Sequence, residues 1–260
     1  MRLLSAAADR YVAEGDDPAA ACVLSGLRQW AQARALLGVA PNPQAERERA
    51  ALLSGLAFAF LKTKSDASSV DRVRIDAWLD ELAQRVEAGF AAKELRASGG
   101  RELAGLAALS VGAATGNRAH WAFGEMAYDE ALGNIDQDGV LASAVEGERT
   151  LADQDIALGA LVMMAELAAR QSGEDWYARR DGAVHRLADK VLDGLRDQSW
   201  FAQRTGKGQF VPSGRDLAWI AFYARRFPAR FAGRVPDGAI FQLPRLGGDL
   251  TTLAEKWVRN

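Results

Sequence analysis

Apolar residues recur at helical spacing along nearly the whole chain. One clear run is Ile75, Trp78, Leu79, Leu82, Val86 and Phe90. This spacing places the side chains on one face of an amphipathic helix. The alternation of apolar and polar residues that marks half-buried strands is almost absent. Residues that favour turns separate the helical segments. The pattern therefore predicts an all-α protein with nine helices, near residues 2–14, 18–37, 44–63, 69–91, 101–115, 118–132, 149–171, 178–196 and 214–227.

Short connections join these predicted helices, and successive helices with short connections tend to pack as antiparallel hairpins. Two architectures fit this pattern. One is an open solenoid of helical repeats, and the other is an incomplete α/α toroid in which the hairpins curve round a central cleft. The sequence shows no repeat of fixed period, which weakens the solenoid.

The pattern changes towards the C-terminus. Residues 198–209 are polar and contain glycine, which indicates a loop, and Val235–Gly248 holds two prolines and three glycines. We therefore expect an irregular C-terminal tail at about 229–260. Because no segment resembles an interdomain linker, residues 1–260 are predicted to form one domain.

Charge and composition narrow the range of partners. The formal net charge is −2, so the chain lacks the excess of positive charge that nucleic-acid binding requires. Of the 32 basic residues only six are lysine. The guanidinium fork of the remaining arginines suits carboxylates, as in an acidic polysaccharide, although a GC-rich genome also produces this bias. The apolar runs, such as Leu103–Ala114, are too short to span a membrane, so no membrane insertion is expected.

The few cysteines and histidines exclude several kinds of site. Cys22 is the single cysteine, so neither an intrachain disulfide nor a cysteine-based zinc site is possible. The histidines are His120 and His185, far apart in sequence. His120 is interpreted as a packing residue of a helix, and His185 as a surface or half-buried helix residue, rather than as ligands. No metal and no cofactor are expected. At Met1 the apolar stretch is too brief for an intact secretion signal.

Several motifs occur in an order that is typical of one enzyme family. The sharpest is Arg245–Thr251, with the sequence RLGGDLT. The others are Gly15–Pro18 leading to Cys22, Trp30–Leu37, Asp136–Leu141, Ala157–Ala165 and Leu217–Trp219. In these segments, from about Leu4 to Thr251, the chain resembles the alginate (polymannuronate) lyases of polysaccharide lyase family 5.

The resemblance implies a fold, a location and a partner. It favours the α/α toroid over the solenoid, a periplasmic location, and a uronate-containing acidic polysaccharide as the partner. The lyases extend further at the N-terminus, so their export signal and lid have no counterpart before Met1. The chain thus resembles an N-terminally shortened member of the family.

The family's catalytic residues are largely substituted. A uronate lyase must neutralise the substrate carboxylate, remove the neighbouring proton and protonate the leaving oxygen. The family's Asn-Asn-His-Ser-Tyr-Trp run falls on Ser98, Gly99, Gly100, Arg101, Glu102 and Leu103. The family's arginine matches Arg149, but its tyrosine, seven residues later, falls on Ile156. The chain is therefore predicted to be a catalytically divergent member.

The remaining polar residues near these positions supply the candidates. Arg149, Glu102 and Asp155 are the candidate catalytic residues. The candidate substrate-binding residues are Arg149, Arg101, Gln154, Asp153 and Trp219, the last for stacking on a sugar.

Three functions remain open from the sequence. The first is a polysaccharide lyase that performs β-elimination with substituted residues, Arg149 and Arg101 neutralising the uronate. The second is a non-catalytic polysaccharide-binding relative in exopolysaccharide handling. The third is a glycoside hydrolase that uses Glu102 with Asp153 or Asp155, because such enzymes need two carboxyl groups across a cleft. First-turn carboxylates such as Glu102 also occur simply to complement the helix dipole.

Overall fold

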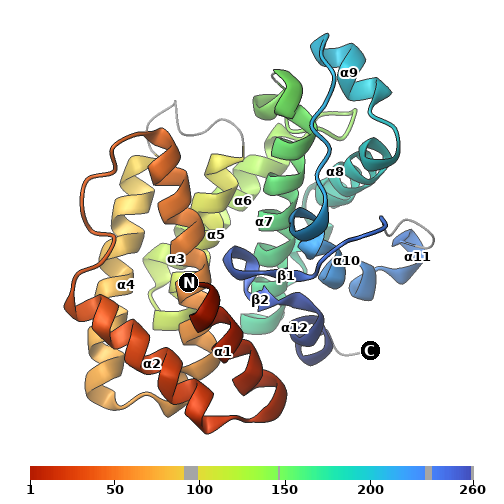
Figure 1. The fold of residues 1–260 in the computed structure, drawn as a ribbon. Coiled ribbons are helices and arrows are strands. Elements are labelled where there is room, and N and C mark those ends of the chain that lie inside the picture. Colours follow the sequence, from red (N-terminus) through yellow and green to blue (C-terminus); the bar gives the residue numbers. More distant parts are fainter. Residues whose placement is uncertain (91–98, 146, 232–235, 259–260) are drawn as a thin grey trace.

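The computed structural model describes residues 1–90, 99–145, 147–231 and 236–258, and these are mainly helical (Figure 1). The α-helices are α1 (Arg2–Glu14), α2 (Asp17–Gln32), α3 (Pro43–Thr63), α4 (Ser69–Gly89), α5 (Gly100–Thr115), α6 (Arg118–Asn134), α7 (Thr150–Gln171), α8 (Arg179–Arg196), α9 (Ser199–Thr205), α10 (Ile220–Arg226), α11 (Pro228–Phe231) and α12 (Leu250–Trp257). The described strands are β1 (Gln242–Leu243) and β2 (Gly248–Asp249), which pair antiparallel. None of the described helices is both long and apolar enough to cross a membrane.

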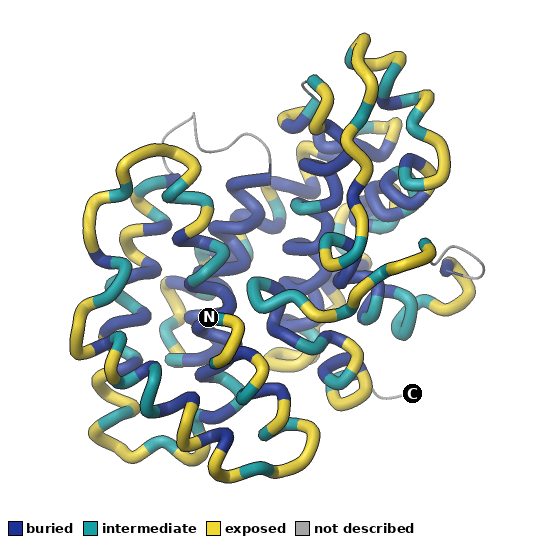
Figure 2. The backbone as a smooth tube through the Cα atoms, viewed as in Figure 1, coloured by how far each residue is buried: buried dark blue, intermediate teal, exposed yellow. Residues whose placement is uncertain are grey.

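The long helices alternate between inner and outer positions along the chain. The inner helices α3, α5 and α7 pack side by side, and α4, α6 and α8 lie outside them. In α5, 15 of the 16 residues are buried, as are 18 of the 22 residues of α7 (Figure 2). A helix that is apolar on all sides belongs in the interior, and both sequences have this character. This alternation of inner and outer helices is the arrangement of an incomplete α/α toroid.

The apolar interior forms two clusters that share α5. The first core, around α1 to α5, includes Leu53 and Trp78 and takes Ala104, Ala107, Val111 and Ala114 from α5. The second core, around α6 to α12, includes Trp176 and Phe222 and takes Leu103, Leu106, Leu109 and Ala113 from α5. The two halves therefore cannot separate without exposing one face of α5.

The helix boundaries differ from the sequence-based expectation in three places. The predicted helix 18–37 ends at Gln32, because Arg34 and Leu36 adopt positive φ. The predicted helix 214–227 begins as the 3₁₀ helix η6 (Gly214–Trp219) and continues as α10. Helix α9 forms within the segment that was predicted to be a loop, and it ends at Gly206 in the left-handed conformation.

The predicted irregular tail contains regular structure. It holds β1, β2 and α12, while residues 232–235 and 259–260 of it lie outside the described residues. Asp249 caps α12, since its carboxylate accepts hydrogen bonds from the backbone amides of Thr251 and Thr252. Leu250 and Leu253 are buried beneath this helix. An irregular tail was thus a wrong prediction for residues 242–257.

The C-terminal segment is anchored to the N-terminal half by a buried charge pair. The Lys62 ammonium on α3 donates to the Asp9 carboxylate on α1 and to the Gly247 carbonyl. Asp9 also accepts a hydrogen bond of 2.9 Å from the backbone amide of Asp249. The Ser54 hydroxyl on α3 donates to the Arg245 carbonyl at 2.7 Å. These bonds fix the 3₁₀ helix η7 (Pro244–Leu246), and with it Arg245, against the first half of the protein.

Candidate functional site

A polar cleft lies between the inner helices. Its volume is about 380 Å³, and it is lined by Gln44, Arg47, Glu48, Ala51, Leu103, Arg149, Asp153, Ile156 and Arg245. These residues come from four separate segments: the start of α3, the start of α5, the start of α7, and η7. The cleft is therefore built by the fold rather than by one continuous sequence motif.

The start of α3 supplies one wall. The Asn42 side chain caps the helix by accepting a hydrogen bond from the Ala45 amide at 2.9 Å, and Pro43 occupies the first turn. The cleft residues of this helix follow at helical spacing, which places them on one face. The Arg47 guanidinium donates to Gln44 Oε1 at 2.9 and 3.1 Å, and the Gln44 amide donates to Glu48 at 2.8 Å. The wall thus presents a linked set of polar groups.

The start of α7 supplies the opposite wall. Arg149, Asp153 and Ile156 follow at spacings of four and three residues, so they share one face. Arg149 Nε lies 4.0 Å from Asp153 Oδ1, and the Arg149 side chain is 55% exposed while that of Asp153 is 11% exposed. The Arg149 guanidinium also lies 5.4 Å from the centre of the Phe210 ring.

The charge of the cleft favours anions. Arg47, Arg149 and Arg245 bring three guanidinium groups to it, against the carboxylates of Glu48 and Asp153. Arg245 has Asp216 as a nearby partner, with 3.8 Å between Nη2 and Oδ1. The whole chain carries a formal charge of −2, so the cleft differs in sign from the average surface.

Arg101 and Glu102 are not among the described residues that line this cleft. Arg101 Nε donates to Glu130 on α6 at 2.9 Å, and its guanidinium lies 4.6 Å from the centre of the Phe123 ring. Glu102 is buried, and its burial raises the pKa of its carboxyl group to about 7. The structure therefore brings neither residue to Arg149, and the predicted use of Arg101 as a uronate neutraliser has no support from its position.

Three further candidates lie in the protein interior. The Gln154 side chain bonds both backbone groups of Leu141 and the carbonyl of Ala144, so it holds the 141–144 segment in place. The fully buried Trp219 ring donates from Nε1 to Asp155 Oδ1 at 2.8 Å. Burial raises the pKa of Asp155 to about 7. Because the Trp219 ring has no exposed face, it cannot stack on a sugar as predicted. Asp155 and Gln154 form hydrogen bonds inside the protein rather than lining the cleft.

The structure also places Gly100 and Ile156, which stand where the family has its histidine and its tyrosine. Ile156 lines the cleft as an apolar group, and Gly100 starts α5 beside Gly99, which has a positive φ and packs closely on the α7 backbone. Ser98 lies outside the described residues. A cluster that could hold a metal ion is not found among the residues described.

The histidines have structural partners elsewhere. His120 Nδ1 lies 2.6 Å from Glu87 Oε1, and His185 Nδ1 lies 2.8 Å from the Tyr223 hydroxyl. His120 is buried, and His185 stacks on the Tyr177 ring. Both residues lie within helices and contact other side chains, as expected from the sequence.

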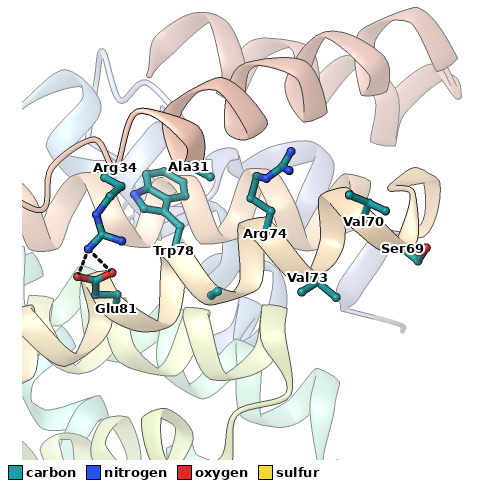
Figure 3. A pocket seen from close by; sticks show the side chains of 9 residues that line it. Ala31, Arg34, Ser69, Val70, Val73, Arg74, Trp78 and Glu81 are labelled. Carbon is teal, nitrogen blue, oxygen red and sulfur yellow. Dashed lines mark hydrogen bonds and ion pairs between the residues drawn. The ribbon is translucent and has the colours of Figure 1, made fainter.

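A larger hollow of about 640 Å³ lies outside the central cleft, between the end of α2 and α4 (Figure 3). Arg34 points across it to the Glu81 carboxylate at 2.6 and 2.8 Å, and Val70 and Val73 extend towards solvent. This hollow brings two guanidinium groups, those of Arg34 and Arg74, whereas the central cleft brings three, so the hollow offers less to an anionic ligand.

The α3 wall and the position of Arg245 in the cleft lining were not predicted from the sequence. The sequence predicted a helix over 44–63 but singled out none of Gln44, Arg47 and Glu48. Their spacing after the Asn42–Pro43 start signal was the available clue, but only the fold shows that Arg149 and Arg245 lie across from them.

Comparison with known proteins decides the family. A family model described as alginate lyase matches residues 5–201, more than half of the chain. The chain belongs to the alginate lyase family. The predicted family membership is thereby confirmed.

Individual relatives of this alginate lyase family member agree. A polysaccharide lyase of Stenotrophomonas maltophilia (strain K279a) is 40% identical over 254 residues, covering 95% of this chain and 75% of that protein. An alginate lyase of Cobetia marina is 26% identical over 255 residues, covering 93% of this chain and 68% of that protein.

Solved structures confirm the toroid as the fold of this family member. A histidine-to-alanine variant of alginate lyase A1-III, complexed with a tetrasaccharide, superposes with a TM-score of 0.87 at 27% identity. That match covers 97% of this chain and 76% of the other. Alginate lyase A1-III from Sphingomonas species A1 gives a TM-score of 0.85 at 26% identity, with 97% and 74% coverage.

Proposed function

We propose that this family member binds a uronate-containing acidic polysaccharide in the cleft between α3 and α7. The observation that carries the proposal is the convergence of Arg47, Arg149 and Arg245 on one cleft. Guanidinium groups bind carboxylates through paired, charge-assisted hydrogen bonds, and a polyuronate presents a carboxylate on every sugar. The tetrasaccharide complexes of the similar alginate lyase A1-III support a sugar polymer as the ligand class.

Binding without turnover is the function that the cleft supports best. Elimination needs a base and an acid besides the neutralising cation. Among the residues that the structure describes, the nine that line the cleft include no histidine, tyrosine or lysine. Ile156, at the position of the family's tyrosine, has no proton to give or take.

β-Elimination with substituted residues is the second candidate, and one observation favours it. Asp153 lies in the cleft beside Arg149, so a uronate held by Arg149 would place its acidic proton near a carboxylate. Hydrolysis by Glu102 with Asp153 or Asp155 receives less support, because Glu102 and Asp155 do not line the cleft. Within the described part of the chain, the other carboxylate of the cleft is that of Glu48.

The test is calorimetric binding of alginate and other polyuronates to the purified protein and its variants. Arg149→Ala and Arg245→Ala should each weaken binding about tenfold or more, since each removes charge-assisted hydrogen bonds. Arg85→Ala on α4, an exposed arginine paired with Glu81, is the matched control and should bind normally. Raising the salt concentration should weaken wild-type binding.

Turnover is measured on the same samples. Ultraviolet absorbance from unsaturated uronate would establish elimination, and loss of that signal in Asp153→Asn would assign the base. New reducing ends without this absorbance would establish hydrolysis instead. If no polyuronate binds, or if the two cleft variants bind as well as Arg85→Ala, the proposed function is wrong.

A further inference from the structure

An exposed phenylalanine stands beside the arginine cleft. Phe210 follows α9 in a segment that runs back along α7 (Figure 1), and 55% of the residue is exposed to solvent. It lines a second hollow of about 320 Å³ together with Glu148, Arg149, Gly208 and Gln209. Arg149 also lines the main cleft, so the two hollows meet at this side chain.

Hydrogen bonds of Phe210 and of the residue before it fix the backbone at this position. Its backbone amide donates to the Glu148 carbonyl at 2.7 Å. The preceding Gln209 side chain accepts from the Leu151 amide at 3.1 Å and donates to the carbonyl of Gly147 at 3.1 Å and to the Thr205 hydroxyl at 2.9 Å. The loop is thus attached to the same turn that carries Arg149. The exposed Phe210 ring lies beside the Arg149 guanidinium, which is 5.4 Å from the ring centre. Preorganisation of the loop backbone reduces the entropy lost when a ligand binds.

We propose that Phe210 is the stacking platform of a second sugar position, which takes the uronosyl residue next to the one held in the arginine cleft. This inference rests on the proposed function of the cleft. One face of a pyranose ring carries mainly C–H groups, and burying it against an aromatic ring removes apolar area of both from water. A half-exposed ring next to a carboxylate-binding arginine supplies both kinds of contact that a uronosyl residue needs.

The surrounding charges set the orientation of this second sugar. Arg149 lies between the two hollows, while Glu148 lies on the side of the second hollow. A sugar carboxylate is attracted to Arg149 and repelled by Glu148, whereas sugar hydroxyl groups can donate to Glu148. The second position therefore selects an acidic sugar whose carboxylate faces the main cleft and whose hydroxyl edge faces Glu148.

Affinity as a function of oligomer length tests the platform. The probes are mannuronate and its oligosaccharides of defined length, from monosaccharide to hexasaccharide, titrated into wild type, Phe210→Ala, Phe210→Trp and Arg149→Ala. In wild type, affinity should rise once the oligomer covers both hollows. Phe210→Ala should lose about tenfold on the longer oligomers and leave the shortest one unchanged. Phe210→Trp should retain the length-dependent gain, because a larger ring preserves stacking.

The controls separate the platform from the proposed function. Met126→Ala on α6 removes a side chain of similar exposure, 47%, that lines neither hollow, and it should bind like wild type at every length. If wild type binds no oligomer, the proposed function fails. If wild type and Arg149→Ala differ but Phe210→Ala matches wild type at all lengths, only the platform is wrong. An equal loss at every length would also overturn a separate second position.

Discussion

Asp155 is a carboxyl group enclosed in the core beneath the cleft. Its Oδ1 accepts the Trp219 hydrogen bond, while Oδ2 is buried with no hydrogen-bond partner among the described residues. Burial raises the pKa of Asp155 from 3.8 to about 7, and burial likewise raises that of Glu102 from 4.5 to about 7. Between those values the folded state keeps protons that the unfolded state has released. Stability should therefore fall as pH rises from about 4 to about 7.

Asp155→Asn should reduce this pH dependence. The amide oxygen can still accept from Trp219, but the side chain no longer ionises, and each pKa unit removed corresponds to about 1.4 kcal/mol. We expect little change in the free energy of unfolding at pH 4 and a gain at pH 8, measured by urea denaturation. Glu102→Gln should act in the same direction. A wild-type stability that rises from pH 4 to 7 would contradict the assignment of these two groups.

Residue types alone identified some of the site but not its orientation. Arg149 and Asp153 were expected from the sequence, and both line the cleft. Gln154 and Asp155 were expected beside them, yet each step along a helix turns the side chain by about 100°. Gln154 and Asp155 therefore lie on a different helix face from Arg149 and Ile156. The spacing along the helix shows from the sequence that Gln154 and Asp155 lie on another face than Arg149. It does not show which of these faces lines the cleft.

At the scale of secondary-structure elements, one buried ion pair joins three parts of the chain. Asp9 on α1 and Lys62 on α3 meet beneath the turn at Gly247 and Gly248. Burial lowers the pKa of Lys62, and the neighbouring Asp9 charge opposes that shift. Gly248 has a φ of 97°, and a Cβ there would lie 2.5 Å from the Asp9 carboxylate. The Asp9–Lys62 pair thus requires glycine at position 248. This turn closely follows Arg245 in the chain.

Removing one partner of this pair should destabilise the fold strongly. Asp9→Ala leaves the Lys62 ammonium buried without its counter-charge, which costs about 3–5 kcal/mol in comparable cases. The double variant Asp9→Ala with Lys62→Met should recover part of that loss, because no unpaired charge remains. Urea denaturation of the single and double variants measures both effects, with Arg10→Ala on α1 as a surface control. Equal stability of the two Asp9 variants would show that the buried charge is not the cause.

The long helices were predictable because their apolar periodicity extends over several turns. The shorter elements were not. In α12 the Asp249 cap and the buried Leu250 and Leu253 were visible in the sequence, but the neighbouring prolines and glycines suggested irregular structure. Helix α9 is held by Phe201, whose ring packs within contact distance of Gly194 on α8. A helix of seven residues is too short to show a repeating apolar pattern of its own.

At the scale of the whole molecule, α5 connects the two cores and packs closely on α6. The approach depends on glycines: a Cβ at Gly105 would lie 2.7 Å from the Ala127 Cβ, and one at Gly112 would lie 2.7 Å from the Trp121 amide nitrogen. The all-α architecture was predictable from periodicity, and the motifs favoured the toroid. The sharing of α5 by both cores was not predictable, because it depends on which apolar residue of α5 faces which half.

Gly112→Ala tests whether the two cores form one cooperative unit. The added methyl group meets backbone atoms of Trp121 and Asn117, which cannot rotate away, so α6 must move from α5 at a cost of about 1–3 kcal/mol. Because α5 supplies both cores, hydrogen exchange followed by mass spectrometry should show the same loss of protection in α4 and in α10. Gly38→Ala, where no atom lies within 4 Å of the new Cβ, is the matched control and should leave both unchanged. Loss of protection confined to one half would mean that the cores unfold separately, and the cleft between them would then lie at a boundary between two independently stable parts.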